Sequence, residues 1–246
     1  MRSPRFRALF WPALGFFLLC ASIFFIDWHK GTKPHGLTFQ DSFALGRSNE
    51  WTSLGGTWEI FGNTMRNASD DRGSKLLTGS HEWEDYSVEA DVMLFGNFGD
   101  TGLMIRSSNE EEGVDSYDGY YAGIRNHGSG LVLGRANYGW VAESEKLTSS
   151  LGEIRSQTWY HLKVLAVGCY VAAEARLPQQ GVEDATAIAV LDHSCIRRGR
   201  VGLRSYSSGG AWKNVQVRQA GQKDLNEMLG RTLSHRASTQ PKWFDR

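Results

Sequence analysis

Apolar and polar side chains alternate along many short stretches between residues 37 and 218. Residues 86–94 are the clearest case: four apolar side chains at every second position face one way, and the carboxylates of Glu89 and Asp91 face the other. A strand of this kind belongs to a sheet with one buried face and one face in water. About a dozen such runs follow one another, separated by glycine-rich turns and without a helical period between them. The pattern therefore predicts an all-β fold, an antiparallel sandwich of two sheets.

The first 36 residues follow a different pattern. Residues 1–7 are basic, residues 8–26 carry no charge, and residues 27–36 form a short polar linker. The uncharged run would make a helix about 28 Å long, close to the hydrocarbon thickness of a bilayer. Because arginines precede it, we expect a transmembrane anchor with the N-terminus in the cytoplasm and the main domain in the periplasm, the extracellular space or a lumen. A cleaved signal peptide is the alternative, although no Ala-x-Ala site follows the apolar run.

Length and composition indicate one domain at 37–218, followed by a polar C-terminal tail at 219–246. Within the tail, residues 223–233 have the spacing of a short amphipathic helix. The 28 glycines and the 12% of aromatic residues suit strands joined by tight turns. The 27 basic and 27 acidic residues cancel, so the chain lacks the positive field that nucleic-acid binding requires.

The cysteines allow one disulfide in the main domain. Cys20 lies within the apolar N-terminal run, which leaves Cys169 and Cys195. In an oxidising compartment their pairing would close a loop of about 27 residues and contribute about 3 kcal/mol to stability. Two buried free thiols are the alternative.

A series of short motifs extends through the predicted domain. They are Asp41–Phe43, Gly55–Trp58, Trp83–Val92, Asp100–Arg106, Gly119–Gly123, Leu133–Arg135, Gly199–Arg204 and Trp212–Val217. In order and spacing they resemble the concanavalin A-like lectin/glucanase superfamily, and most closely the carbohydrate-binding jelly-roll modules of fructan-degrading enzymes and the 3-keto-disaccharide hydrolase domains. The resemblance implies a jelly-roll sandwich over nearly all of 37–218. It says less about function, because lectins, hydrolases and adhesion modules share this scaffold.

The resemblance also provides a test for catalysis. Family-16 glycoside hydrolases of this superfamily place Glu-x-Asp-x-Glu on one strand, and retaining chemistry needs a proton-donating carboxyl. Here Met93 stands at the third position, after Glu89 and Asp91, and a thioether cannot donate a proton. We therefore interpret the domain as a carbohydrate-binding module without catalytic activity. One alternative is an enzyme of the 3-keto-disaccharide hydrolase type that uses Glu89, Asp91 or Asp118, and another is a laminin G-like module that binds a protein.

Aromatic and charged side chains gather in the second half of the motif series. A sugar ring has an apolar C–H face and a fringe of hydroxyls, so an aromatic platform with Arg and Asp groups suits it. Tyr120 and Tyr121 point to opposite faces of their strand, and we expect one of them to be exposed. The expected partner is an oligosaccharide or polysaccharide. The candidate ligand-binding residues are Arg106, Asp118, Tyr120, Tyr121, Arg135, Tyr138, Trp140 and Arg204.

Calcium is the one metal that the sequence brings into consideration. A calcium ion often ties the first and last strands of such jelly rolls, and Asp41 could supply an oxygen to it. Lys213 and Asn214 occupy the place where the resembled families commonly have an acidic residue, which weakens this site. No other cofactor is indicated, because the histidines lack metal-ligand spacing and there is no phosphate-binding loop.

Overall fold

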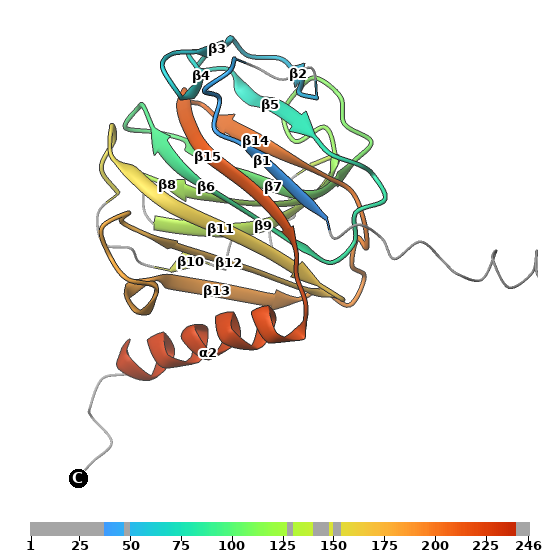
Figure 1. Cartoon of the computed structure of the whole chain (residues 1–246), viewed down its shortest axis with the longest axis vertical. Coiled ribbons are helices and arrows are strands. Elements are labelled where there is room, and N and C mark those ends of the chain that lie inside the picture. Colours follow the sequence, from blue (N-terminus) through green and yellow to red (C-terminus); the bar gives the residue numbers. More distant parts are fainter. Residues whose placement is uncertain (1–36, 47–49, 127–129, 140–147, 150–153, 240–246) are drawn as a thin grey trace, which may run out of the picture. The chain divides into compact units, whose positions relative to one another are not determined.

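The computed structural model describes residues 37–46, 50–126, 130–139, 148–149 and 154–239. Two antiparallel sheets form the domain (Figure 1). The eight-stranded sheet contains, in order, β13 (Thr186–Leu191), β12 (Tyr170–Arg176), β11 (Trp159–Val167), β6 (Tyr86–Leu94), β15 (Gly210–Gln219), β4 (Met65–Asn67) and β3 (Trp58–Ile60), and β1 (Thr38–Asp41) pairs with β15. The seven-stranded sheet contains β10 (Thr148–Ser149), β9 (Gly130–Asn137), β8 (Asp118–Arg125), β7 (Asp100–Ser108), β14 (Arg200–Tyr206), β5 (Arg72–Thr78) and β2 (Thr52–Leu54). The predicted two-sheet sandwich is confirmed.

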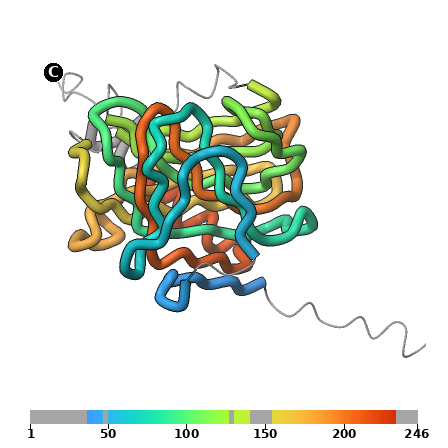
Figure 2. The backbone as a smooth tube through the Cα atoms, turned by 90° about the horizontal axis from the view of Figure 1, so that it is seen from above, coloured from blue at the N-terminus to red at the C-terminus, as the bar shows by residue number. Residues whose placement is uncertain are grey.

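The core lies between the two sheets and follows the alternation in the sequence. Val88, Ala90 and Val92 of β6 are buried in it, whereas Glu89 and Asp91 lie half-buried on the outer face. The central strand β6 pairs with β11 on one side and β15 on the other. Figure 2 shows β1 as the blue segment at the margin of the molecule, where it pairs with β15. The fold therefore brings the first and last strands of the sandwich together.

A helix, α2 (Gln222–Thr239), follows the last strand and is longer than the sequence indicated. Leu225 and Met228 are buried in one cluster with Leu165, Ala172 and Ala187, so α2 packs along β13 and against the outer faces of β12 and β11 (Figure 1). The carboxylate of Asp224 accepts a hydrogen bond from the N–H of Gly221 at 3.0 Å, which caps the first turn. The folded domain thus extends beyond the expected limit at residue 218, because the apolar stripe of the tail covers part of the eight-stranded sheet.

No helix in the part of the chain described above is both long and apolar enough to cross a membrane. The predicted anchor at 8–26 lies outside the described residues. One 3₁₀ turn, η2 (Val182–Asp184), connects β12 to β13.

Candidate functional site

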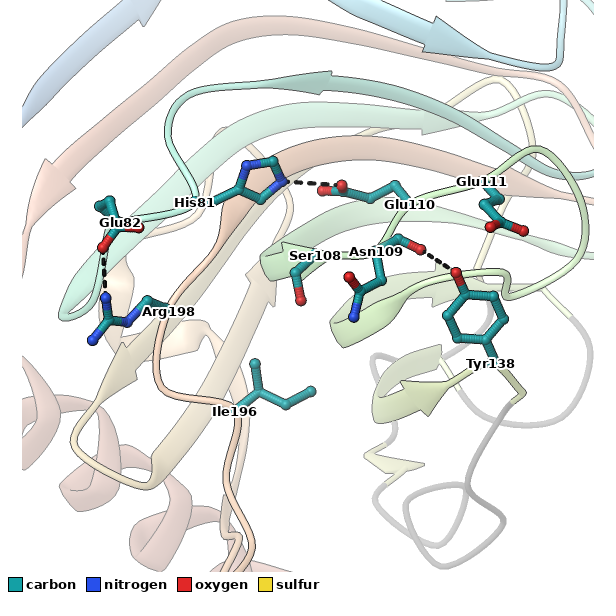
Figure 3. Close-up of a pocket in the computed structure, with 9 residues that line it drawn as sticks. All are labelled: His81, Glu82, Ser108, Asn109, Glu110, Glu111, Tyr138, Ile196 and Arg198. Atoms are coloured by element: carbon teal, nitrogen blue, oxygen red, sulfur yellow. Dashed lines mark hydrogen bonds and ion pairs between the residues drawn. The ribbon is translucent and has the colours of Figure 1, made fainter.

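A cleft of about 710 Å³ opens at one end of the seven-stranded sheet (Figure 3). It lies where β5, β7 and β9 end and where β8 and β14 begin. The side chains come from four separate segments, because antiparallel strands bring their connecting turns together at the sheet ends. The residues that line it are His81, Glu82, Ser108, Asn109, Glu110, Glu111, Tyr138, Ile196 and Arg198.

Tyr138 provides an aromatic surface in this cleft. Its backbone has a φ of 47°, and the residue is 52% exposed. The hydroxyl donates a hydrogen bond to the main-chain oxygen of Asn109 at 2.7 Å, so the position of the ring is fixed (Figure 3). Of the candidate ligand-binding residues predicted from the sequence, Tyr138 is the described one that lines the cleft. Trp140 lies outside the described residues.

An imidazole and a carboxylate face each other across the upper part of the cleft in Figure 3. His81 Nε2 lies 3.2 Å from Glu110 Oε2. The Glu110 side chain is only 6% exposed, and its second oxygen, Oε1, has no hydrogen-bond partner among the described residues. The pair was not predicted, because the two residues lie 29 positions apart in turns whose local sequence gives no sign of their contact.

The wall that carries Ile196 and Arg198 is held by a disulfide. Cys169 and Cys195 are joined, with a Cα–Cα distance of 5.3 Å, which confirms the predicted pairing. The bond ties the turn between β11 and β12 to the segment between β13 and β14. It therefore links one wall of the cleft to the eight-stranded sheet.

Arg106 also supports this wall. Its side chain is 1% exposed, and it donates hydrogen bonds to the main-chain oxygens of Gly168 at 2.7 Å and Ile196 at 3.0 Å. A third bond goes to the main-chain oxygen of Glu84 at 2.8 Å, and a fourth to the carboxylate of Asp85. Arg106 thus contacts three turns of the protein and lies behind the cleft.

Three more of the predicted residues bond to cleft-lining residues or to residues close to them in the chain, namely Tyr120, Arg135 and Asp118. The Tyr120 hydroxyl accepts a hydrogen bond from the N–H of Ile196 at 3.0 Å and donates one to Asp192 at 2.8 Å. Arg135 pairs with the same carboxylate of Asp192 at 3.0 Å. Asp118 accepts a hydrogen bond from the side chain of Asn109 at 2.7 Å. The structure therefore brings most of the predicted cluster to this end of the sheet, in supporting positions.

The expectation that Tyr120 or Tyr121 would be exposed is wrong. They do point to opposite faces, but both are 1% exposed. Tyr120 lies in the central core, and Tyr121 packs with Tyr117 and Met104 on the outer face of the seven-stranded sheet. Residues 109–117, which we call the β7–β8 segment, carry Tyr117 across this face and cover it.

Arg204 lies under the same segment. Its guanidinium pairs with Asp100 at 3.0 Å and with Asp115, and it stacks over the Tyr121 ring at 4.5 Å. Burial alone would lower the pKa of Arg204, but Asp100 and its other neighbours outweigh burial and raise it. Beside it, Lys75 Nζ donates to the main-chain oxygen of Gly113 at 2.7 Å. Burial, with a further contribution from Arg204, lowers the pKa of Lys75 to about 8.

Glu89 and Asp91 lie on the outer face of the other sheet. His161 bridges them, with Nδ1 3.1 Å from Asp91 and Nε2 3.9 Å from Glu89, and Asn214 donates to Asp91 at 2.9 Å. Burial alone would raise the pKa of Asp91, but the hydrogen bonds from His161 and Asn214 lower it below its usual value. Such a carboxylate is a poor proton donor at neutral pH. Asp118 belongs to the seven-stranded sheet, so the three carboxylates suggested for catalysis do not form one site.

Both oxygens of Asp41 accept hydrogen bonds from other groups of the protein. One accepts from the N–H of Phe43 at 2.7 Å, and the other from Trp51 Nε1 at 2.8 Å. No group of three or more His, Cys, Asp or Glu side chains that could hold a metal ion occurs among the residues the structure describes. The calcium site remains a prediction without structural support.

Comparison with protein families identifies the domain. Residues 46–218 match the model of the 3-keto-α-glucoside-1,2-lyase-like domain, which covers well over half of the chain. The chain belongs to this family. Its fold is the concanavalin A-like jelly roll. The comparison with curated proteins gave no match.

Several solved structures share the fold of this family member. The carbohydrate-binding module CBM66 from Bacillus subtilis is 21% identical with a TM-score of 0.54, over 69% of this chain and 96% of the module. The exoplasmic/lumenal domain of VIP36, bound to Ca²⁺ and Man3GlcNAc, is 10% identical with a TM-score of 0.53, over 74% and 88%. A Bacillus subtilis protein of unknown function with a galectin-like fold is 12% identical with a TM-score of 0.53, over 74% and 94%. At these identities the likeness shows a shared fold alone.

Lys75 gives a prediction for the pH dependence of stability. Its pKa falls from an ordinary value of 10.5 to about 8 on folding. Between these values the unfolded chain holds a proton that the folded protein has released, so the free energy of unfolding should rise with pH. Burial raises the pKa of Tyr86 and Tyr117 above the ordinary 10, so these groups lower stability only above about pH 10.

The measurement is urea unfolding of the wild type and of Lys75→Met at intervals from pH 7.5 to 10. The free energy of unfolding should rise with pH in the wild type, and this rise should be smaller in Lys75→Met. Lys223→Met, which changes an exposed lysine at the start of α2, should leave it intact. Parallel curves for the wild type and Lys75→Met would contradict this account.

Proposed function

We propose that this protein binds carbohydrate in the cleft at the end of the seven-stranded sheet. The observation that carries the proposal is the half-exposed ring of Tyr138 beside the side chains of Asn109 and Glu111, with the His81–Glu110 pair on the neighbouring wall. The ring can stack on the C–H face of a sugar, and the polar groups can bond its hydroxyls. The family to which the chain belongs is named for a sugar substrate, which supports the same reading.

The charges in the cleft favour a neutral sugar. Three carboxylates line it, those of Glu82, Glu110 and Glu111. The guanidinium of Arg198 is engaged by Glu82 and, at 3.3 Å, by Glu84. Carboxylates accept hydrogen bonds from hydroxyls but repel an anion. The buried Oε1 of Glu110, which has no partner among the described residues, is suited to accept one such bond.

Removing the ring of Tyr138 should weaken sugar binding. Stacking of one aromatic ring contributes about 0.5–1.5 kcal/mol, so Tyr138→Ala should lower affinity by about 2- to 12-fold. Tyr138→Phe is the matched control, because it keeps the ring and removes only the hydroxyl that bonds to Asn109. A glycan array would first select the ligand, and titration calorimetry would then compare the variants. Equal affinity of Tyr138→Ala and wild type for that ligand would exclude the cleft as its site.

A second candidate function is lyase activity, and the His81–Glu110 pair favours it. In a 1,2-elimination on a 3-keto-glucoside, a base removes the proton from C2, beside the ketone. The electron pair of the C2–H bond then forms a C1–C2 double bond, the C1–O bond breaks, and the leaving oxygen takes up a proton. A neutral His81 that donates Nε2–H to Glu110 keeps Nδ1 as a proton acceptor, so it could act as this base.

The lyase candidate predicts turnover of a nitrophenyl 3-keto-α-glucoside. Because general base catalysis contributes about 10²- to 10⁴-fold, His81→Gln, which removes the base, should reduce kcat by at least about 100-fold. Glu110→Gln, which removes the charge that orients the base, should also lower kcat. Glu112→Gln is the matched control, since Glu112 is an exposed carboxylate in the same segment that does not line the cleft. Release of nitrophenol is the measurement. If the wild type releases none, the lyase candidate is rejected and sugar binding stands alone.

We also propose that residues 8–26 anchor the protein in a membrane, with the domain on the extracytoplasmic side. The uncharged run behind an arginine-rich segment supports the anchor. The Cys169–Cys195 disulfide suits an oxidising compartment. Protease added to intact cells or spheroplasts should then digest the domain. Protection that ends only on lysis would place the domain in the cytoplasm.

A further inference from the structure

The outer face of the seven-stranded sheet carries charged side chains that the cleft does not use. Lys75 on β5 and Arg204 on β14 are register partners and lie side by side. Asp100 on β7 pairs with Arg204 at 3.0 Å. All three are at most 3% exposed, which is unusual for charged residues on the outer face of a sheet. We call this group the charged floor.

The β7–β8 segment covers the charged floor with two acceptor groups. The carboxylate of Asp115 bonds to Arg204, and the main-chain oxygen of Gly113 bonds to Lys75 at 2.7 Å. Asp115 itself is 7% exposed, so its carboxylate is removed from water. Acceptor groups of the segment thus complete the neutralisation of the two cations, Arg204 and Lys75.

Two polar groups at this contact lack partners among the described residues. They are the hydroxyl of Tyr117 and Nε of Arg204, on residues that are 0% and 3% exposed. A buried donor without an acceptor costs roughly 1–3 kcal/mol, and native structures contain few of them. The segment therefore satisfies the floor incompletely. A ligand with more oxygen atoms than Asp115 could also bond to Nε of Arg204, which remains on the sheet when the segment moves.

The backbone of the covering segment departs from the preferred conformations of its residues. Asn109 and Asp115 have φ values of 53° and 50°, in the left-handed region that L-residues adopt at a cost. The bonds to Arg204 and Lys75 are contacts that hold the segment down.

The charge of the floor changes when the segment is lifted. Lys75, Arg204 and Arg125 would then face a single carboxylate, Asp100. The other acidic residues near Lys75 are Glu110 and Glu112, which belong to the segment and would leave with it. The uncovered floor is therefore cationic, in contrast to the acidic cleft.

We propose that the charged floor is a second binding site, specific for a sugar that carries a carboxylate, and that Asp115 occupies it in the absence of this ligand. The uronic acid carboxylate would take the place of the Asp115 carboxylate on Arg204, as the same chemical group in the same geometry. The rings of Tyr121 and Tyr206, which lie on strands of the sheet beside the Arg204 guanidinium, supply apolar contact for the sugar ring. That the ligand is a sugar rests on the proposed function; that it is a carboxylate rests on the floor itself.

Asp115→Asn tests this inference in the full-length protein. The variant removes the competing charge and keeps the size of the side chain. The probes are trigalacturonic acid and the neutral galactotriose of the same linkage. If the wild-type floor is open for about a tenth of the time or less and Asp115→Asn leaves it open, the variant should bind trigalacturonic acid at least about tenfold more tightly, with no such gain for galactotriose. Glu112→Gln removes the same charge from the segment without touching Arg204, and should not reproduce the gain.

A second measurement uses the wild type, so that the test survives if Asp115→Asn does not fold. Trigalacturonic acid should protect Lys75 from reductive methylation, as read by mass spectrometry, and galactotriose should not. Equal affinities of Asp115→Asn and Glu112→Gln for the acidic sugar, or methylation of Lys75 that neither sugar changes, would overturn the proposal. Tyr138→Ala separates the two sites: it should weaken the binding of neutral sugars in the cleft without weakening the binding of the acidic sugar to the floor. Loss of acidic binding in Tyr138→Ala would also overturn it.

Discussion

The turns at one end of the sandwich depend on the buried guanidinium group of Arg106. Three main-chain oxygens, from Glu84, Gly168 and Ile196, accept its hydrogen bonds, and they belong to turns far apart in the sequence. Burial lowers the pKa of Arg106, and the nearby carboxylate of Asp85 opposes this effect. A planar group with five donors can bond three carbonyls and a carboxylate at once, which is one bond more than the three donors of a lysine allow. The cleft has a fixed wall because these carbonyls share one partner.

The disulfide and two core tyrosines also hold the wall of the cleft that carries Ile196 and Arg198. Cys195 is joined to Cys169, and the N–H of the adjacent Ile196 bonds to Tyr120. Tyr86 contributes from β6, since its hydroxyl accepts from the N–H of Arg106 at 2.7 Å and donates to Gly199 at 2.8 Å. An aromatic core residue with a polar end can thus join the two sheets to the turns. The polar groups of the cleft are positioned by atoms that a ligand would not touch.

The β7–β8 segment gives the two proposed sites their opposite character. Its first part places Asn109, Glu110 and Glu111 in the cleft, and its second part places Asp115 and Tyr117 on the charged floor. Acidic side chains at both ends make the cleft suitable for neutral sugars and neutralise the cations beneath. Movement of this one segment would therefore alter both sites. The backbone of this segment joins the two sites directly, so no contact across the core is needed to connect them.

Alternation along the strands determined the sandwich, the inward face of β6 and the opposite orientations of Tyr120 and Tyr121, because strand geometry depends on local sequence. The sequence also placed Tyr138, which lines the cleft, among the candidate binding residues and allowed the Cys169–Cys195 pair. It could not tell that Tyr121 is buried, since that depends on a segment folding back over the sheet. Arg106 and Arg204 have similar local sequence patterns. Arg106 nevertheless bonds to the carbonyls of distant turns, whereas Arg204 pairs with two carboxylates. Local periodicity fixes which way a side chain points; only the tertiary structure decides what covers it.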